Sequence, residues 1–596
     1  MASYNRVNGV PSPANTYLQT ELLRKTWGFG GVVVSDDYAI HYMIHGHHWI
    51  PPGATKPVDG PMATACGMKA GTDLNCGFTY SGNVRKAIEA GLMGEEVLDR
   101  ALIRAFSERM RTGEFDDERA VPYNKISPDV IGCAAHDALA EAIAREAPVL
   151  LKNAPAAGGA PLLPLEAGRL RKVVLLGEKR QVKEMSLGGY SMHKPSVVST
   201  PEQGLREALR RLNPQVAFTC ITPQADFSEE ERAAIREADV AIAYVGTLNG
   251  VDCKENKDRK TIDLPRGQAQ WIQKVAALNP RVVVWVQAVA QVNLEPFREN
   301  VPAIVWTGHN GQAQGRAFAS LLLGEANPSG RLSCTWYQNE KELASITDYT
   351  LRAINGTKGR TYQYFTGAVA YPFGHGLSYT TFAYGDLALG ADTVSPDGSV
   401  TATVKVTNTG SRPGQEVVQL YVASPNAKTR ERPRERLFGF EKVSLRPGET
   451  KTVSMTFPAA ELYYWDTTAK RRTYDLGTYE VRVGASSEDI RLRAPFTLAG
   501  SLTPRLSVVY ADVDRQIFDL TKGKTQACIT PSACRNDESF YDAKALSVTY
   551  ASSCPAVIAV DALGTFTAKA PGVATITVTI TADGCTKSTT FPIAVL

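Results

Sequence analysis

Two adjacent carboxylates, Asp36 and Asp37, follow an uninterrupted apolar run in the stretch VVVSDDYAI at residues 32–40. An apolar run that ends in acids is typical of a parallel strand buried on both faces, whose carboxyl end opens into a pocket. In a β/α barrel, catalytic side chains lie at that end of the strands. Either aspartate could instead simply cap the next helix. The surrounding sequence has to decide between these two interpretations.

A second concentration of charge lies in the stretch GTLNGVDCKENKDRKTIDLP at residues 246–265. Seven charged residues cluster within it: Asp252, Lys254, Glu255, Lys257, Asp258, Arg259 and Lys260. Composition alone favours a solvated surface loop for such a cluster. Loops also carry function, however, so its acidic residues are kept as candidates.

The overall composition limits the classes of protein to consider. With 596 residues the chain is too long for one core, so we expect several domains. Hydrophobic residues make up 43% and charged residues 21%, as in ordinary globular proteins. A net charge of +4 gives no reason to expect a nucleic-acid partner. No apolar run approaches the ~20 residues of a membrane span, and the residues after Met1 do not form a signal peptide.

The cysteines are candidates for disulfides, and the cysteines and histidines are candidates for metal ligands. Of the ten cysteines, four fall in the last 70 residues: Cys528, Cys534, Cys554 and Cys585. That density predicts disulfides and hence an exported protein. The other six include no CxxC pair, so we expect no structural zinc. His45, His47 and His48 resemble a zinc cluster, but no cysteine or acid falls at ligand spacing, which favours substrate or interdomain contact over metal.

The first 115 residues alternate between strand-like and helical patterns. Helical spacing occurs in TYLQTELLRKTW, in MATACGMKAG before Gly71, and twice between residues 84 and 115. This is β/α repetition, but a closed eightfold barrel takes about 250 residues. Residues 1–115 are therefore expected to form only part of a barrel. The polar, Pro-containing residues 116–145 are expected to be a linker.

Residues 146–379 are expected to form an α/β sandwich. Apolar runs predict strands of a sheet covered on both faces at 172–178, 238–246, 281–289 and 303–310, with a helix at 266–278. Residues 380–500 show the period-2 alternation of a β-sandwich. Residues 501–596 form a further β unit, in which GVATITVTI alternates between apolar and threonine side chains.

SYNRVNGVPSPAN, LLRKTWGFGGVVVSDD and KAGTDLNCG resemble the second half of the catalytic barrel of glycoside hydrolase family 3. The resemblance extends into the second and third domains, over roughly 500 residues, and the third resembles the family's fibronectin type III-like domain, which braces the others. In that family the aspartate directly after the serine is the nucleophile, which implies that role for Asp36. Asp37 departs from the usual uncharged residue, and strand alternation predicts that it lies outside the pocket.

The resemblance also implies an acid/base. The family pattern has a glutamate three residues before an Asp-Arg pair, followed by Leu-Pro. Glu255 stands three residues before Asp258 and Arg259, and Leu264 and Pro265 follow. Glu255 is therefore the implied acid/base, although Asn256 stands where relatives have glycine.

Further substrate-binding candidates are Tyr4, His47, His48 and Asp73. Tyr4 could contact the sugar or the nucleophile, or be a buried aromatic with a satisfied hydroxyl. GTDLNCG and HGHHW are most similar to the β-xylosidase branch. The resemblance thus implies a retaining exo-acting β-glycosidase that releases terminal xylose, or glucose, from plant-derived oligosaccharides or aryl glycosides, without cofactor or metal.

The last domain resembles a group 2 bacterial Ig-like domain, which suggests a secreted, periplasmic or cell-surface protein. No counterpart of the N-terminal barrel strands precedes Met1. We expect a truncated gene fragment; a partner chain or dimer that completes the barrel and a degenerate protein without activity are the alternatives. The competing functional class is accordingly a non-catalytic carbohydrate-binding or surface-display relic.

Overall fold

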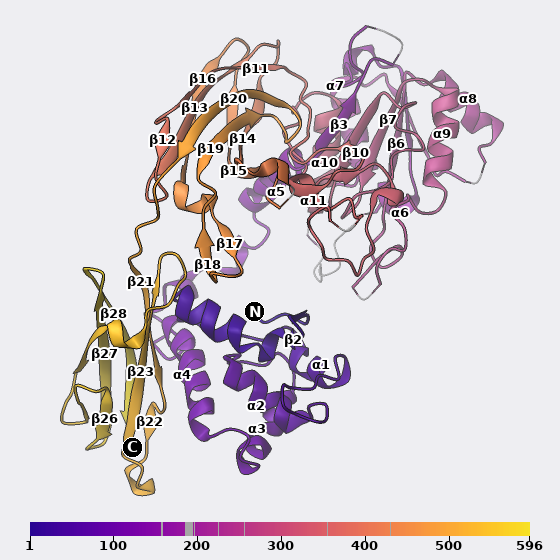
Figure 1. Cartoon of the computed structure of the whole chain (residues 1–596). Helices are drawn as coiled ribbons and strands as arrows, with labels where there is room; N and C mark the ends of the chain where they lie inside the picture. The colour runs from indigo at the N-terminus through magenta and orange to yellow at the C-terminus, as the bar shows by residue number, and fades with distance from the viewer. Residues whose placement is uncertain are drawn as a thin grey trace. The chain divides into compact units, whose positions relative to one another are not determined.

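The structure is a computed structural model of the chain, and it describes residues 1–156, 159–184, 195, 197–224, 226–255, 257–354, 356–429 and 431–596. The chain divides into two compact units (Figure 1). The first unit holds residues 1–127, 464–473 and 502–596, and the second unit holds residues 128–463 and 474–501. No described helix has the length and apolar character needed to cross a membrane.

The predicted barrel part contains three extended segments that run parallel. Val34 bridges to Leu74 on one side, and Ser35 bridges to Ala2 on the other. The backbone bonds alternate as in a parallel ladder: Ala2 N donates to Val34 O at 2.8 Å, and Ser35 N donates to Leu74 O at 2.8 Å. The segment that carries Asp36 is therefore held between two neighbours.

Helices surround these segments. Their bounds are η2 Tyr17–Thr26, α1 Ala39–His45, α2 Gly60–Ala70, α3 Thr79–Glu89 and α4 Glu95–Arg111, and a hairpin joins β1 Arg6–Val7 to β2 Val10–Pro11. The helices predicted from periodicity are present, although η2 is wound as a π-helix. α2 ends at Gly71, whose φ of +109° is one that L side chains rarely adopt. Buried Ile40 and Met43 anchor α1 to the local core.

The second half of the expected linker is instead a helix, α5 Ala134–Glu146. Its alanine-rich sequence has high helix propensity. Arg316 on α10 (Gln314–Leu322) also holds it, through ion pairs of 2.7 Å to Asp137 and 2.6 Å to Glu141. Residues 134–145, expected to be linker, therefore form a helix that is held against the α/β domain.

A six-stranded sheet forms the centre of the α/β domain. Its order is β3-β8-β7-β6-β4-β5, and all neighbours are parallel except β3 and β8. The strands are β3 Val149–Asn153, β4 Lys172–Leu176, β5 Ala217–Ile221, β6 Val240–Gly246, β7 Val282–Gln287 and β8 Ala303–Thr307. The further elements are α6 Lys179–Val182, α7 Pro201–Leu212, α8 Glu229–Glu237, α9 Gln268–Leu278, α11 Thr361–Tyr364, β9 Trp336–Tyr337 and β10 Val369–Tyr371.

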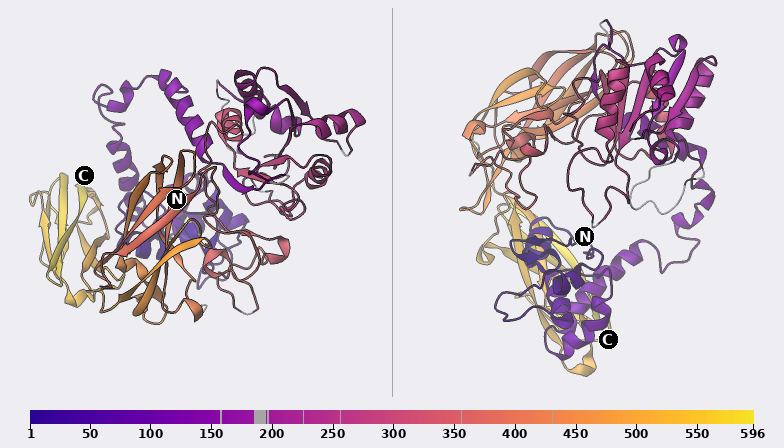
Figure 2. Two further views of the ribbon diagram at one scale, coloured as in Figure 1. Left: turned by 90° about the horizontal axis from the view of Figure 1, so that it is seen from above. Right: turned by 90° about the vertical axis from the view of Figure 1, so that its right-hand side faces the viewer.

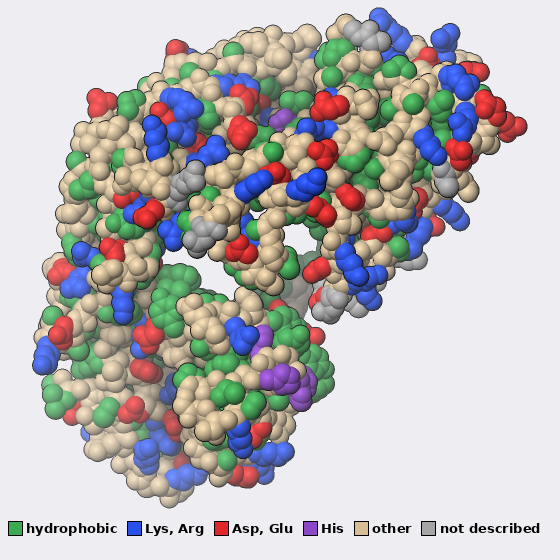
Figure 3. Space-filling view, turned by 45° about the vertical axis from the view of Figure 1, so that its right-hand side comes forward, with side chains coloured by type: hydrophobic (Ala, Val, Ile, Leu, Met, Phe, Trp, Pro, Cys, Tyr) green, Lys and Arg blue, Asp and Glu red, His purple; other side chains and the backbone are tan. Residues whose placement is uncertain are grey.

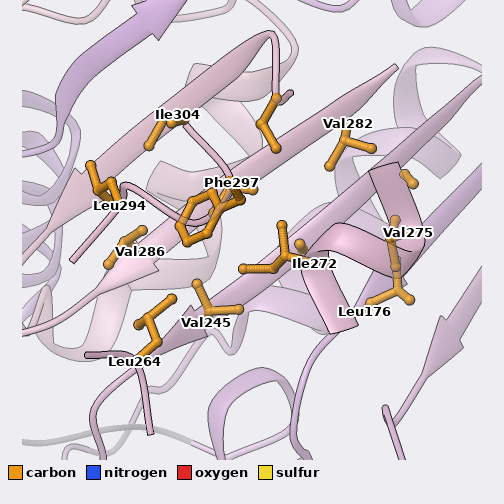
Figure 4. Packing of buried hydrophobic residues seen from close by; sticks show 14 of the residues in the cluster. Leu176, Val245, Leu264, Ile272, Val275, Val282, Val286, Leu294, Phe297 and Ile304 are labelled. Carbon is orange, nitrogen blue, oxygen red and sulfur yellow. The ribbon is translucent and has the colours of Figure 1, made fainter. Parts of the chain in front are cut away.

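Helices cover both faces of this sheet (Figures 1 and 2). One face packs against α8 and α9, where Ile272 and Val275 meet Val245 and Val286 (Figure 4). The other face carries the intervening strand residues, such as Tyr244, and packs against α7 and α10. Burial on both faces explains why the strands read as continuous apolar runs.

Residues 382–498 form a β-sandwich with a three-stranded sheet, β11-β13-β16, and a five-stranded sheet, β12-β20-β19-β14-β15. The strands are β11 Phe382–Leu389, β12 Thr393–Val394, β13 Ser399–Asn408, β14 Gly414–Ala423, β15 Arg436–Leu445, β16 Thr450–Pro458, β19 Gly477–Gly484 and β20 Ile490–Leu498. A hairpin of β17 Tyr464–Asp466 and β18 Arg471–Thr473 belongs to the first unit.

The C-terminal domain has two four-stranded sheets, β21-β23-β26-β25 and β22-β28-β27-β24. The strands are β21 Leu506–Val513, β22 Ile517–Phe518, β23 Gln526–Arg535, β24 Ser547–Ser552, β25 Ile558–Val560, β26 Thr565–Ala568, β27 Gly572–Ala582 and β28 Cys585–Val595. Glu538 of this domain accepts hydrogen bonds from Trp27 Nε1 of the partial barrel at 3.3 Å and from Arg472 Nη2 of the β17–β18 hairpin at 2.6 Å.

The expected disulfides are absent, because all ten cysteines, each among the described residues, are free thiols. Strand register explains this for three of the four in the last domain: Cys528 lies opposite Thr565, Cys534 opposite Val508, and Cys585 opposite Ala582. The prediction of disulfides is wrong, and the argument for export that rested on it falls with it.

Candidate active site

Asp36 lies where the central extended segment of the partial barrel ends. Its backbone N–H donates to Ala2 O at 2.8 Å, which ties it to one neighbouring segment. Ser35, buried directly before it, accepts hydrogen bonds at Oγ from Cys76 N at 3.1 Å and Asn75 Nδ2 at 3.2 Å. Bonds to both neighbours therefore fix the half-buried Asp36 at the carboxyl ends of the segments, where barrel enzymes place their chemistry.

The backbone turns immediately after Asp36. Asp37 N donates to Asp36 Oδ1 at 2.8 Å, and Tyr38 adopts a left-handed φ of +56°. Asp37 therefore belongs to a turn and not to the strand, so strand alternation does not determine where its side chain lies. Asp37 is exposed, and its carboxylate accepts a 3.4 Å hydrogen bond from Cys76 Sγ. That bond, with some desolvation and the negative charges of Asp37 and Asp36, raises the pKa of the Cys76 thiol.

Tyr4 and His47 lie at the same rim. The Tyr4 hydroxyl donates to the Asp37 carbonyl, and His47 Nε2 lies 2.6 Å from the Tyr4 carbonyl. Tyr42 packs edge-on against both rings, with centroids 5.6 Å from Tyr4 and 5.4 Å from His47. Two of the predicted substrate-binding residues are thus brought together beside the aspartates.

His48 follows His47 but adopts a left-handed φ of +45°, and its side chain is exposed. Among the residues that the structure describes, no group of three or more His, Cys, Asp or Glu could hold a metal ion.

Asp73 does not reach the rim, which corrects its assignment as a substrate-binding residue. Its side chain is 2% exposed and forms 2.8 Å ion pairs with Arg24 and Arg104. Its Oδ2 also accepts a hydrogen bond from Val33 N at 2.9 Å. Both carboxylate oxygens are therefore occupied inside the protein, and Asp73 holds the start of the segment that ends at Asp36.

Glu255 belongs to the second unit and follows β6 in the sheet. Across the sheet the parallel strands lie in the order β5-β4-β6-β7-β8. The chain therefore goes from β4 to β5 on one side and then returns to β6 on the other side of β4, so the direction of winding reverses between β4 and β6. Open α/β sheets bind ligands at such a switch point, outside the carboxyl ends of the strands. The loop from residue 247 to α9 begins at this position. Sheet topology therefore favours a functional loop here independently of its composition.

The base of this loop is fixed to β4. Asp252 forms an ion pair with Arg266 and accepts from Leu248 N at 2.6 Å. Arg266 also pairs with Glu178, just beyond β4, at 2.7 Å. At the start of the loop, Gly246 has a φ of +146°, and a Cβ there would lie 1.8 Å from the Gln287 carbonyl oxygen, so only glycine fits.

Glu255 lies at the tip of the loop. Lys254 and Lys257 pair through reciprocal backbone hydrogen bonds of 3.1 and 3.0 Å, which close a tight turn around it. Its side chain is exposed, and within the described residues no hydrogen bond or ion pair engages its carboxylate. An anchored base with an unengaged carboxylate at the tip suits a group that exchanges protons with a ligand.

Several residues that shape the two sites were missed in the sequence. Ser35 and Glu178 both stand directly at the ends of predicted strands, a signal that could have identified them. Arg24 and Arg104 gave no such signal, because they reach Asp73 from helices far away along the chain.

Three stretches match known domain families. Residues 1–107 match the Glycosyl hydrolase family 3 N terminal domain, residues 148–379 the Glycosyl hydrolase family 3 C-terminal domain, and residues 416–487 the Fibronectin type III-like domain. These matches fall on the partial barrel, the α/β domain and the sandwich of residues 382–498. The predicted fold classes of these three regions are confirmed.

Individual relatives are glycosidases by name. The chain is 33% identical over 388 residues to probable beta-D-xylosidase 7 of Arabidopsis thaliana, covering 64% of this chain and 49% of the relative. It is 32% identical over 531 residues to the periplasmic beta-glucosidase of Salmonella typhimurium, covering 82% and 66%. The chain thus spans about half of the length of the first relative and about two thirds of the second.

The fold of the chain is similar to that of a solved beta-glucosidase structure. A beta-glucosidase from Listeria innocua in complex with isofagomine superposes with a TM-score of 0.71 at 26% identity, over 84% of this chain and 68% of that one. On these matches, the chain belongs to glycoside hydrolase family 3.

Proposed function

We propose that this chain is the catalytic and substrate-enclosing part of a retaining, exo-acting β-glycosidase that releases terminal xylose, or alternatively glucose, from plant-derived oligosaccharides. The observation that carries the proposal is the placement of Asp36: a half-buried carboxylate at the carboxyl ends of three parallel segments, fixed by backbone bonds on both sides. Xylose is preferred because relatives include beta-xylosidases from plants, fungi and bacteria.

In the proposed mechanism Asp36 attacks the anomeric carbon and Glu255 protonates the departing oxygen. A covalent glycosyl-enzyme forms, and Glu255 then removes a proton from the water that releases the sugar. A retaining mechanism needs the two carboxyl groups about 5–5.5 Å apart around the bound sugar. Tyr4 and His47 would contact sugar hydroxyls at the rim beside Asp36, with His48 nearby in sequence. No cofactor takes part in this chemistry.

The proposal extends to assembly and location. A partner chain or a dimer would complete the barrel by pairing with the outer edges of the segments at Ala2 and Leu74. A secreted or periplasmic location fits the periplasmic relative. The sandwich of residues 382–498 would brace the two catalytic parts, and the C-terminal domain remains a predicted bacterial Ig-like domain.

The test is hydrolysis of 4-nitrophenyl β-xyloside and β-glucoside by the whole chain. Glu255→Ala should lower turnover by about 10²–10⁴-fold, and azide should restore part of it by replacing the missing acid/base. Asp36→Asn should abolish turnover without azide rescue. Asp258→Asn, a nearby exposed acid, is the matched control and should retain activity. A folded wild-type chain that hydrolyses neither glycoside would favour the second candidate, a non-catalytic carbohydrate-binding relic.

A further inference from the structure

The histidine-rich stretch after Asp36 has a second feature that the proposed hydrolysis leaves unused. α1, Ala39–His45, carries His41 and His45 four residues apart, and both side chains are exposed. Residues four apart on a helix lie one above the other on the same face. Figure 3 shows histidine side chains gathered on the surface of the molecule.

The two imidazoles already lie next to each other. Their ring centroids are 4.2 Å apart and the ring planes are tilted by 36°. Ile40 and Met43 on the other face of the helix are 0% exposed, so packing against the core fixes which face of α1 points to solvent. Tyr38 contacts the His41 ring edge-on, at a centroid distance of 6.0 Å. The pair is thus presented to solvent by a helix whose orientation is fixed by its core.

We propose that His41 and His45 chelate a divalent transition-metal ion such as Zn²⁺, Ni²⁺ or Cu²⁺. Imidazole nitrogens are preferred ligands of these ions, and the same i, i+4 spacing supplies two ligands in metal-binding helices of the H-E-x-x-H type. In the described part of the chain no third His, Cys, Asp or Glu completes the group. Water fills the remaining positions, so the bound ion exchanges readily, unlike a closed structural zinc.

The neighbouring histidines, His47 and His48, lack the arrangement of the pair on α1. His47 Nε2 is 2.6 Å from the Tyr4 carbonyl, so its ring is already engaged. His48 is exposed but lies beyond the end of α1 and has a left-handed φ of +45°, so it does not share the helical spacing of His41 and His45. Within this stretch, His41 and His45 on α1 combine exposure with adjacent rings.

The test is calorimetric titration of the whole chain with NiCl₂, after its accessible thiols are blocked with iodoacetamide. We expect one ion per chain in a step that EDTA reverses. His41→Ala and His45→Ala should each weaken that step at least about tenfold, since even residues that only support a ligand typically cost 10–100-fold. His48→Ala is the matched control and should bind as the wild type does.

Circular dichroism should show that all variants are folded, and His41→Gln offers a second substitution of similar polarity. Three results would overturn the proposal: undiminished binding by the His41 and His45 variants, an equal loss in His48→Ala, or one ion shared by two chains. Because the measurement is of binding, its outcome is independent of whether the chain hydrolyses glycosides.

Discussion

The buried ion pair of Asp73 should control the stability of the partial barrel, and Asp73→Asn is the change that tests this. The carboxylate accepts from Arg24 at 2.8 Å, from Arg104 at 2.8 Å and from Val33 N at 2.9 Å. Arg24 is itself 1% exposed. Burial and the charge of Arg104 lower the pKa of Arg24, while Asp73 opposes this shift. Asparagine keeps the shape but leaves the Arg24 charge buried without a counter-charge.

The contacts of Asp73 set the size of the expected loss in unfolding free energy. Removing one partner of a buried pair costs about 3–5 kcal/mol, and two charge-assisted hydrogen bonds at about 1.5–3 kcal/mol each give a similar sum. Replacing Arg24 as well, in Asp73→Asn/Arg24→Met, removes the stranded charge and should recover most of the loss. The Arg104 side chain is 21% exposed, against 2% for Arg24, so its charge keeps some contact with solvent. The double variant should therefore be more stable than Asp73→Asn alone.

Hydrogen exchange with mass spectrometry measures the loss of stability in the three extended segments themselves. The amides of Val33, Ser35 and Asp36 are bonded within the three-segment array. A loss of about 3 kcal/mol corresponds to roughly 150-fold faster exchange through opening of that array. Asp116→Asn, at an exposed acid of the same unit, is the control. If Asp73→Asn leaves exchange and urea unfolding within about 0.5 kcal/mol of wild type, the ion pair does not have the role assigned to it.

Three further predictions concern other parts of the chain. Burial lowers the pKa of His375 below its ordinary 6.5, so the folded protein should lose stability as the pH falls below about 6.5. His375→Gln should flatten the pH dependence of thermal unfolding, and an unchanged profile would contradict this. Asp37→Asn should lower the pKa of the Cys76 thiol and speed its alkylation by iodoacetamide near pH 8, whereas an equal or slower rate would refute the contact. Glu538→Gln should cost the first unit about 1–3 kcal/mol in urea unfolding by weakening the bond from Arg472, and no loss would mean that the C-terminal domain is not held there.

The sequence predicted the elements whose side chains repeat with a regular period. β4, β6, β7 and β8 are buried on both faces, so each is a continuous apolar run that composition alone reveals. α2 was found with its end because Gly71 takes a φ that glycine favours. These features are local, and their signals lie within a few residues of one another.

The errors came from contacts that are distant in the sequence. Asp73 stands at a strand end and so resembled a pocket residue, but Arg24 and Arg104 approach it from two helices. Residues 134–145 were expected to be linker, but ion pairs from Arg316 to Asp137 and Glu141 hold them as the helix α5. Cysteine density suggested disulfides, but strand register decides which side chains meet. The placement of Asp36, by contrast, followed from its position after an apolar run.

The most direct test of the account is covalent trapping of the glycosyl-enzyme. The whole chain would be incubated with 2-deoxy-2-fluoro-β-xylosyl fluoride, which forms the intermediate but releases it slowly, and digested for peptide mass spectrometry. The account predicts a single fluoroxylosyl adduct on the peptide that contains Asp36, and no adduct in Asp36→Asn. An adduct on another residue, or glycoside hydrolysis without any adduct at Asp36, would contradict it.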